Sequence, residues 1–173
     1  MENLPRYLLF LAAYWAIFFY KFLRNPYLLC TSELASTFFP HWLWMGRQLR
    51  EGIFPAEDNI FYKYPASISF LATFYPLNLL SAYIGSFFNM DNAFRFYAYF
   101  ILGHYLLGSL FSYFLFAQWC SPMAAIFGAL TLTYSGYMIK PQTPCFVYTA
   151  TWVPLALMGN PIGMMMSLYG GYY

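Results

Sequence analysis

The sequence predicts an all-α fold, namely a polytopic transmembrane helical bundle with interfacial or re-entrant helices in its first outer loop, truncated at its C-terminal end. Three observations predict it. Of the 173 residues, 61% are hydrophobic and only 8% are charged, whereas soluble domains carry about 25% charged residues. The apolar residues form long runs, and most charged residues lie between these runs. The last run, 161–173, is too short to cross a bilayer, so we expect the bundle to continue beyond it.

Charge and cysteine content argue against several classes of function. The net charge is only +2, and the eight cations form no basic patch along the chain, which argues against nucleic acid as a partner. Cys30, Cys120 and Cys145 are odd in number and widely spaced, so neither a disulfide framework nor a CxxC metal site is expected. No phosphate-binding loop, GxSxG, HExxH or dinucleotide fingerprint occurs. We therefore expect a single integral membrane domain over 1–173.

The apolar run 7–23 is the first predicted span. Arg6 precedes it, and Lys21 and Arg24 lie at its far end, where long cationic side chains reach the membrane interface. A cleaved signal peptide is the alternative. The run is bulky and aromatic and no small-x-small cleavage site follows it, so we favour an uncleaved membrane anchor.

The segment 30–69 is predicted to be a polar loop with an interfacial helix over 40–51. Pro40 suits the first turn of a helix, and Gly52 suits the position just past its end. One apolar face is formed by residues spaced three or four apart, Phe38, Trp42, Met45 and Leu49, while Arg47, Gln48 and Arg50 lie toward the other side. Such a helix lies either in the membrane interface or against protein, and the sequence leaves both open.

The apolar range 67–88 is predicted to be kinked or re-entrant. Pro76 and Asn78 interrupt it, and a proline disfavours helix in the residue before it. Two short helical pieces are therefore expected, although the range is also long enough for one kinked span.

The remaining runs predict the rest of the bundle. Range 92–118 is the clearest span, and 122–139 follows after a very short connection, so the two are expected to form an antiparallel pair. The small residues Ala124, Ala125, Gly128 and Ala129 would let these helices approach closely. Range 146–158 is a further span interrupted by Pro154, and 161–173 is an incomplete one.

Charged residues near the first outer loop are the candidates for chemistry. Glu33 follows the first span closely. A partly desolvated carboxylate at this position would act as a base on an acceptor hydroxyl. The alternative is that Glu33 is a solvated loop residue. Glu57 and Asp58 are candidate ligands of a divalent cation, although an Asx turn explains the pair as well. Arg47, Arg50 and Lys63 are candidates for binding a lipid phosphate, with snorkelling to the interface as the alternative.

Two polar residues of range 92–118 suggest a different class of function. Arg95 marks one end of the run, and His104 interrupts its apolar interior. An imidazole inside a membrane span is a functional candidate, so a transporter with a polar path through both residues is one hypothesis. A neutral, hydrogen-bonded packing histidine is the simpler interpretation, and no inverted repeat supports transport.

Several short motifs occur in an order that resembles the YfhO-like bacterial membrane proteins, which belong with the GT-C class of polytopic glycosyltransferases. The motifs are Glu33, Phe38-Phe39-Pro40, Arg50-Glu51-Gly52 with Pro55, Tyr64-Pro65, Phe74 to Leu80, Ser135-Gly136-Tyr137 and Trp152-Val153-Pro154-Leu155. The resemblance covers the chain from about Tyr7 to Tyr173. FYPLNLL following REGxxP is its most specific part, and each short piece alone is a weak signal.

The resemblance implies a multi-pass protein of the bacterial inner membrane. Such enzymes take a sugar from a polyprenyl-phosphate carrier and pass it to an acceptor on the extracytoplasmic side, so membrane lipids and the lipid-linked sugar are the implied partners. An acid in the first outer loop is the usual base, which here implies Glu33. Missing C-terminal spans, or another membrane subunit, would complete the site.

Three differences from the family pattern, together with the distribution of cations, argue against this interpretation. Ser32-Glu33 replaces the usual Asp, Ala56 to Asn59 replaces a Trp-Asn-like segment, and the chain stops in about its fifth span. The family arrangement places the N-terminus inside and segment 30–69 outside. The cations of that segment and its flank point the other way under the positive-inside rule. We adopt the family arrangement. A non-enzymatic or degenerate membrane protein or subunit is the alternative function.

Overall fold

The computed structural model describes residues 3–29, 34–55, 76–135 and 144–159, and these residues are helical or lie in turns, without a strand. The elements are α1 (Leu4–Phe18), α2 (Tyr20–Arg24), the 3₁₀-helix η1 (Pro26–Leu29), the π-helix η2 (Leu34–Phe38), α3 (Phe39–Arg50), α5 (Pro76–Gly85), α6 (Met90–Phe116), α7 (Pro122–Thr133) and α9 (Pro144–Gly159). The predicted all-α class is thus confirmed for this part of the chain. The number of membrane crossings stays a prediction.

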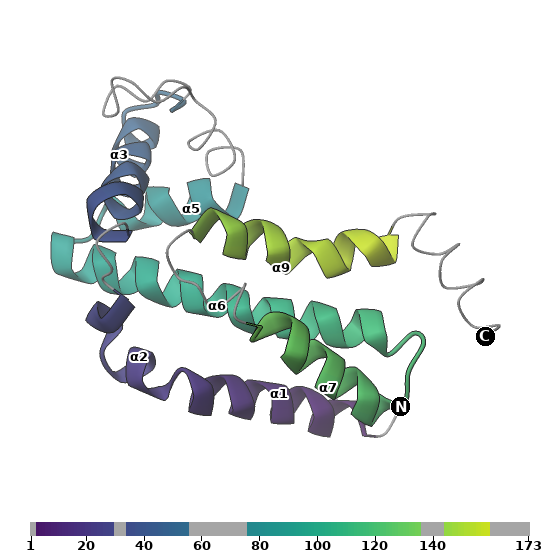
Figure 1. The fold of residues 1–173 in the computed structure, drawn as a ribbon. Helices are drawn as coiled ribbons and strands as arrows, with labels where there is room; N and C mark the ends of the chain where they lie inside the picture. Colours follow the sequence, from purple (N-terminus) through teal and green to yellow (C-terminus); the bar gives the residue numbers. More distant parts are fainter. Residues whose placement is uncertain (1–2, 30–33, 56–75, 136–143, 160–173) are drawn as a thin grey trace.

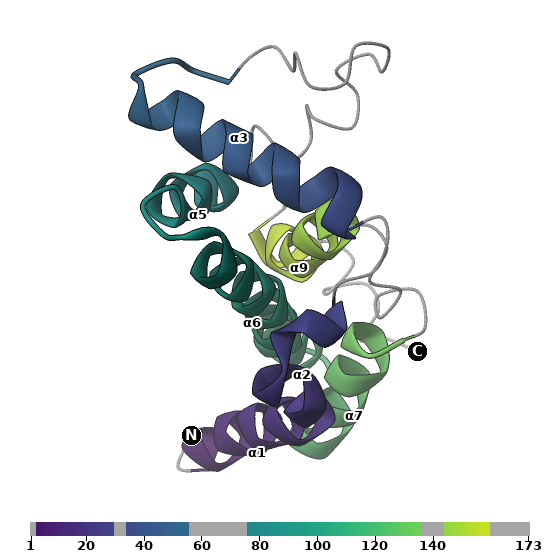
Figure 2. The ribbon, with the colours of Figure 1, turned by 90° about the vertical axis from the view of Figure 1, so that its left-hand side faces the viewer.

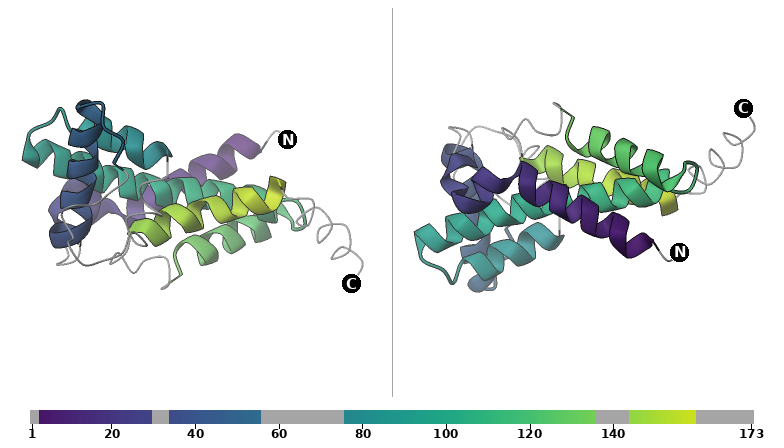
Figure 3. Two further views of the ribbon diagram at one scale, coloured as in Figure 1. Left: turned by 90° about the horizontal axis from the view of Figure 1, so that it is seen from above. Right: turned by 90° about the horizontal axis from the view of Figure 1, so that it is seen from below.

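Helix α6 is the axis of the molecule. It has 27 residues, begins at the cap Asn89, whose side chain accepts a hydrogen bond from the Asn92 amide, and runs to Phe116. Helices α1, α7 and α9 lie alongside it, while α3 and α5 lie at its N-terminal end (Figures 1 and 3). Within the described residues, α6 is the one unbroken helix whose length and composition suit a membrane crossing. At 1.5 Å per residue it is about 40 Å long, enough to span the hydrocarbon core.

Helices α1 and α2 form a nearly continuous helix. The amide of Phe19 donates to the carbonyl of Trp15 at 2.9 Å, and the amide of Leu23 donates to the carbonyl of Phe19 at 2.8 Å, so the hydrogen-bond ladder crosses the junction. Only the backbone of Phe19 is irregular, with φ −93° and ψ 12°. Fifteen-residue α1, Phe19 and five-residue α2 together extend about 31 Å, the thickness of a bilayer core. The apolar run predicted over 7–23 therefore lies within one long helical segment.

Helix α3 forms where the sequence predicts a helix over 40–51. It ends in a Schellman motif, in which the amides of Gly52 and Ile53 donate to the carbonyls of Leu49 and Gln48 at 3.1 and 2.9 Å, and Gly52 has the positive φ of 78° that this motif requires. The predicted apolar face is buried, with Trp42 and Met45 almost fully enclosed. It packs mainly on α5, and α3 lies across the end of α6 rather than along it (Figures 1 and 2). Of the two predicted settings, packing on protein is confirmed for this face.

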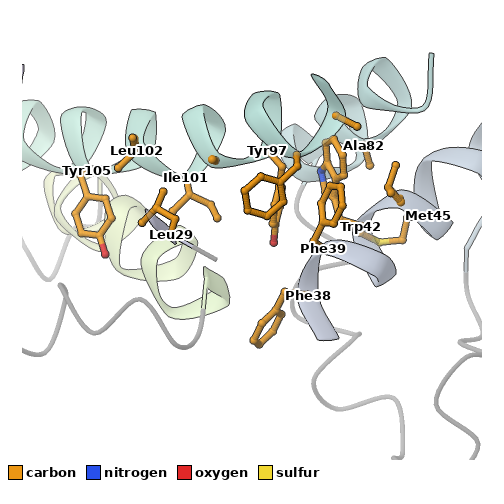
Figure 4. Close-up of a cluster of buried hydrophobic side chains, with 14 of the residues drawn as sticks. Leu29, Phe38, Phe39, Trp42, Met45, Ala82, Tyr97, Ile101, Leu102 and Tyr105 are labelled. Atoms are coloured by element: carbon orange, nitrogen blue, oxygen red, sulfur yellow. The ribbon is translucent and has the colours of Figure 1, made fainter. Parts of the chain in front are cut away.

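Two apolar clusters hold the helices together. The larger one joins η1, α3, α5 and α6 through residues such as Phe39, Trp42, Tyr97 and Ile101 (Figure 4). The smaller one joins α1, α6 and α7 around Leu11, Tyr113, Ala125, Ile126 and Ala129. Both clusters lie along α6, so this helix supplies the surface on which the other helices are positioned.

The antiparallel pair formed by α6 and α7 agrees with the prediction (Figure 1). Ala125 and Ala129 are fully buried between the helices, and a side chain on Gly128 would lie only 2.9 Å from the ring of Phe116. Ala125, Gly128 and Ala129 therefore permit close approach, as predicted, whereas Ala124 is exposed. Helix α7 ends at Thr133, whereas the predicted run continues to 139, and 136–143 lies outside the described residues.

Two prolines affect their helices in different ways. Pro76 is the first residue of α5, as expected of a residue that breaks the run 67–88, and the stretch before it lies outside the described residues. Pro154 lies inside α9, which continues to Gly159, so the predicted interruption there is wrong. A neighbouring helix can satisfy backbone groups that a proline frees, and α9 packs along α6. The range 161–173 lies outside the described residues.

Candidate functional site

Arg47 and Arg50 lie on the exposed side of α3, opposite its buried face. They are three residues apart and therefore neighbours on the helix surface. Both belong to the last turn, where the carbonyl ends of the helix favour positive charge. The sequence thus predicts correctly that the two guanidinium groups face away from the apolar core.

The two arginines differ in their contacts. Arg50 Nη1 donates to the carbonyl of Ser86 at 3.3 Å, and its guanidinium carbon lies 5.8 Å from the ring centre of Phe87. These contacts tie α3 to the turn between α5 and α6. The Arg47 guanidinium has no hydrogen bond or ion pair with any described residue. It is therefore the better placed of the two to accept a ligand.

A third arginine lies near the start of α6. Arg95 Nε is 3.1 Å from the Asp91 carboxylate and 3.4 Å from the Tyr27 hydroxyl, and its guanidinium carbon lies 5.6 Å from the Tyr27 ring centre. The Tyr27 ring stacks on Phe94 at 5.4 Å. The side chains of Arg95 and Asp91 are half exposed, so this ion pair is screened by solvent and contributes little stability. Its main effect is to fix a cation at the end of α6.

One end of the molecule therefore gathers most of the described positive charge. We name as the cationic end the exposed side chains of Lys21, Arg24, Arg47, Arg50 and Arg95, which come from α2, α3 and the start of α6 (Figure 1). The carboxylates described at this end are Glu51 and Asp91. Guanidinium groups hold phosphate oxygens through paired, charge-assisted hydrogen bonds, so this end suits a phosphate group.

The other predicted site residues lie outside the described residues. They are Glu33, Glu57, Asp58 and Lys63. Glu33 immediately precedes Leu34, the first residue of the helical segment that leads into α3. The divalent cation predicted for Glu57 and Asp58 stays a prediction, and the described residues contain no group of three or more metal-ligating side chains.

Polar contacts inside the bundle are a feature that the sequence does not reveal. His104 is 2% exposed, and its Nδ1 lies 2.7 Å from the carbonyl of Phe100. The Thr151 hydroxyl of α9 donates to the carbonyl of His104 at 3.1 Å, and the Tyr134 hydroxyl, just past α7, lies 3.3 Å from Ser109 Oγ. Hydrogen bonds of this kind join helices in an apolar environment. The imidazole of His104 bonds within α6, and its backbone carbonyl accepts the hydrogen bond from α9, as expected of a packing histidine.

Arg95 and His104 do not form one polar path. They are nine residues apart on α6, which corresponds to about half a turn around the helix beyond whole turns and about 13 Å along it. Arg95 is exposed at the end of the helix, whereas His104 is buried. The geometry therefore gives no support to the transporter hypothesis.

The arrangement allows one kind of chemistry among the described residues, namely the recognition of an anion by arginines at the end of an apolar bundle. The base and the cation ligands that the sequence predicts, Glu33, Glu57 and Asp58, lie outside these residues. Comparison with models of protein families, with curated proteins and with solved structures gives no match.

Proposed function

We propose that the chain is the N-terminal part of a multi-pass inner-membrane glycosyltransferase that binds a polyprenyl-phosphate sugar at the cationic end. The observation that carries the proposal is the placement of α3. This helix lies across the end of α6 (Figure 2) and buries its apolar face on α5, while Arg47 and Arg50 are exposed. A lipid carrier that lies along the bundle would present its phosphate at this level.

A membrane setting is supported by the exposed apolar surface. Leu9 and Ile17 of α1 are 71% and 76% exposed, and Phe127 of α7 is 65% exposed. Covering such a surface with water is unfavourable, by about 25 cal/mol for each Å² of apolar area. Half of the apolar window of α6 is exposed as well. Together with the low content of charge, this surface favours a bilayer as the surroundings of α1, α6 and α7.

Each candidate site residue has its own role in the proposed reaction. Glu33 removes the proton from the acceptor hydroxyl, whose oxygen then attacks the anomeric carbon of the sugar. The bond between that carbon and the carrier phosphate breaks, and the polyprenyl phosphate leaves with the bonding electrons. Arg47 stabilises the charge on the leaving phosphate, while Arg50 holds α3 in place through the Ser86 carbonyl. Lys63 would add a further contact to the phosphate, and Glu57 and Asp58 would hold a divalent cation.

Polyprenyl-phosphate binding by the purified full chain provides the first test. We expect Arg47→Gln to weaken binding by roughly ten- to a hundredfold, because hydrogen bonds to charged groups contribute about 1.5–3 kcal/mol. Native mass spectrometry measures the bound lipid directly. Lys21→Gln, which removes an exposed cation of α2 instead of one of α3, is the matched control and should weaken this binding less. Equal loss in both variants would show non-specific attraction and would contradict a site at α3.

Sugar transfer provides the second test. In membranes that contain the whole protein with any following spans, Glu33→Gln should abolish transfer from radiolabelled polyprenyl-phosphate sugars while carrier binding persists. Arg47→Gln should mainly raise the KM for the carrier. Transfer that is unaffected by Glu33→Gln would rule out the role of this base. Carrier binding without transfer in the unaltered protein would favour the alternative, a non-enzymatic membrane subunit.

A further inference from the structure

A second surface lies at the opposite end of the molecule, between α1 and α7. It is a groove of about 270 Å³. Its apolar walls are formed by Tyr7 and Phe10 of α1 and by Met123, Ile126, Phe127 and Leu130 of α7. Ile126 is almost fully buried, whereas Phe10, Met123 and Phe127 are at least half exposed. The groove is therefore open to the surroundings along its length and has almost no polar lining.

One cation lies at the end of this groove. Arg6 belongs to its lining and is exposed, and it uses one donor, Nη1, in a 3.3 Å hydrogen bond to the Asn3 side chain. Both acids that the structure describes, Glu51 and Asp91, lie at the cationic end, and Glu2 lies outside the described residues. The start of α7 is at the same end as Arg6, so backbone amides add partial positive charge there (Figure 3).

We propose that this groove binds one acyl chain of an anionic phospholipid, with the lipid phosphate on Arg6. The groove follows α7 from Met123 to Leu130, which is about 10 Å of helix at 1.5 Å per residue. A single acyl chain suits these apolar walls, and its phosphate suits the Arg6 guanidinium at the end of the groove.

The charge at the groove's end selects the lipid. A cation near a membrane surface attracts anionic lipids, and basic pockets between spans bind their head groups. The site is separate from the cationic end and does not depend on the proposed transfer reaction.

Site-specific photocrosslinking tests the proposal. The whole protein, with benzoylphenylalanine in place of Phe127, is reconstituted in equal parts of dioleoyl phosphatidylglycerol and dioleoyl phosphatidylcholine, and lipid adducts are counted by mass. We expect phosphatidylglycerol adducts to exceed phosphatidylcholine adducts about fivefold, the preference that one nearby cation provides. The same probe in place of Leu157, which is exposed on α9 and does not line the groove, should show no preference.

Substitution of Arg6 separates head-group recognition from general contact with lipid. With the probe in place of Phe127, Arg6→Gln should reduce the ratio of adducts to about one, whereas Arg6→Lys should keep most of the preference. A preference that survives Arg6→Gln, or that is equal for the probes in place of Phe127 and Leu157, would overturn the proposal. Crosslinks to a second copy of the chain instead of to lipid would also overturn it, because a protein contact would then cover the groove.

Discussion

Trp42 is the residue on which the packing of α3 depends most. It is 1% exposed, its Nε1 donates to Ser81 Oγ at 3.0 Å, and Ser81 Oγ in turn donates to the Asn78 carbonyl at 2.8 Å. Its ring also lies 4.9 Å from that of Tyr97 and directly on Gly85. A buried indole needs a partner for its N–H, and α5 supplies one. This side chain therefore joins α3 to both α5 and α6.

Removing the hydrogen bond of Trp42 separates its polar contribution from its packing. Trp42→Phe should lower the free energy of unfolding by about 1–3 kcal/mol, because Ser81 loses a buried partner. Trp42→Ala should cost about 3–5 kcal/mol, since it also leaves a cavity. Unfolding in mixed micelles followed by circular dichroism measures both. Trp44→Phe is the control, because Trp44 is a half-buried tryptophan of the same helix. If it costs as much as Trp42→Phe, the Ser81 contact is not the cause.

At the scale of elements, the contact between α3 and α5 depends on two glycines. A side chain on Gly46 would collide with the carbonyl of Ala82, and one on Gly85 would collide with the Trp42 ring. The backbones therefore approach more closely than alanine permits. By contrast, nothing lies within 4 Å of a side chain built on Gly103 in α6. Substitution of glycine by alanine can therefore be compared at two tightly packed positions, Gly46 and Gly85, and at one open position, Gly103.

Gly46→Ala should destabilise the protein, because α3 or α5 must shift away from a backbone group that cannot rotate aside. We expect a loss of about 1–3 kcal/mol, the usual range for overpacking. Gly103→Ala should be neutral or should stabilise α6 by up to about 1 kcal/mol, since alanine is the better helix former. Thermal unfolding of the two variants in one detergent compares them directly. A Gly46→Ala protein as stable as the unaltered one would show that α3 does not pack as closely as described.

At the scale of the whole molecule, the described cations are unequally divided. The cationic end holds Lys21, Arg24, Arg47, Arg50 and Arg95, while the opposite end holds Arg6. The positive-inside rule would place the cationic end in the cytoplasm. The proposed function requires the reverse orientation. Two physical arguments thus lead to opposite topologies, and Cys120, exposed in the turn between α6 and α7, can distinguish them.

Labelling of Cys120 decides the orientation. In a variant with Cys30→Ser and Cys145→Ser, we expect a membrane-impermeant maleimide to label intact spheroplasts only after permeabilisation, because the proposed topology places this turn in the cytoplasm. The further change Cys120→Ser should abolish labelling and serves as the control. Labelling of intact spheroplasts would place the cationic end in the cytoplasm and would contradict an extracytoplasmic transfer reaction.

Part of the candidate site follows from the sequence because it depends on local geometry. The spacing of Arg47 and Arg50 predicts a shared exposed face, and Pro40 with Gly52 predicts the limits of α3. The contacts of Arg50 with Ser86 and Phe87 do not follow, because these residues meet only when α5 and α3 pack. For the same reason the groove beside Arg6 has no signature in the sequence.

The sequence by itself determined that this protein is helical and strongly apolar, because composition and helical periodicity are properties of each segment. It also determined the apolar face of α3 and the antiparallel pair of α6 and α7, where a short connection leaves one arrangement. Only the tertiary structure decided that this face packs on α5, that His104 is bonded within the bundle and that most described cations share one end. Those features depend on how helices distant in sequence pack, and many packings satisfy the same pattern of apolar residues.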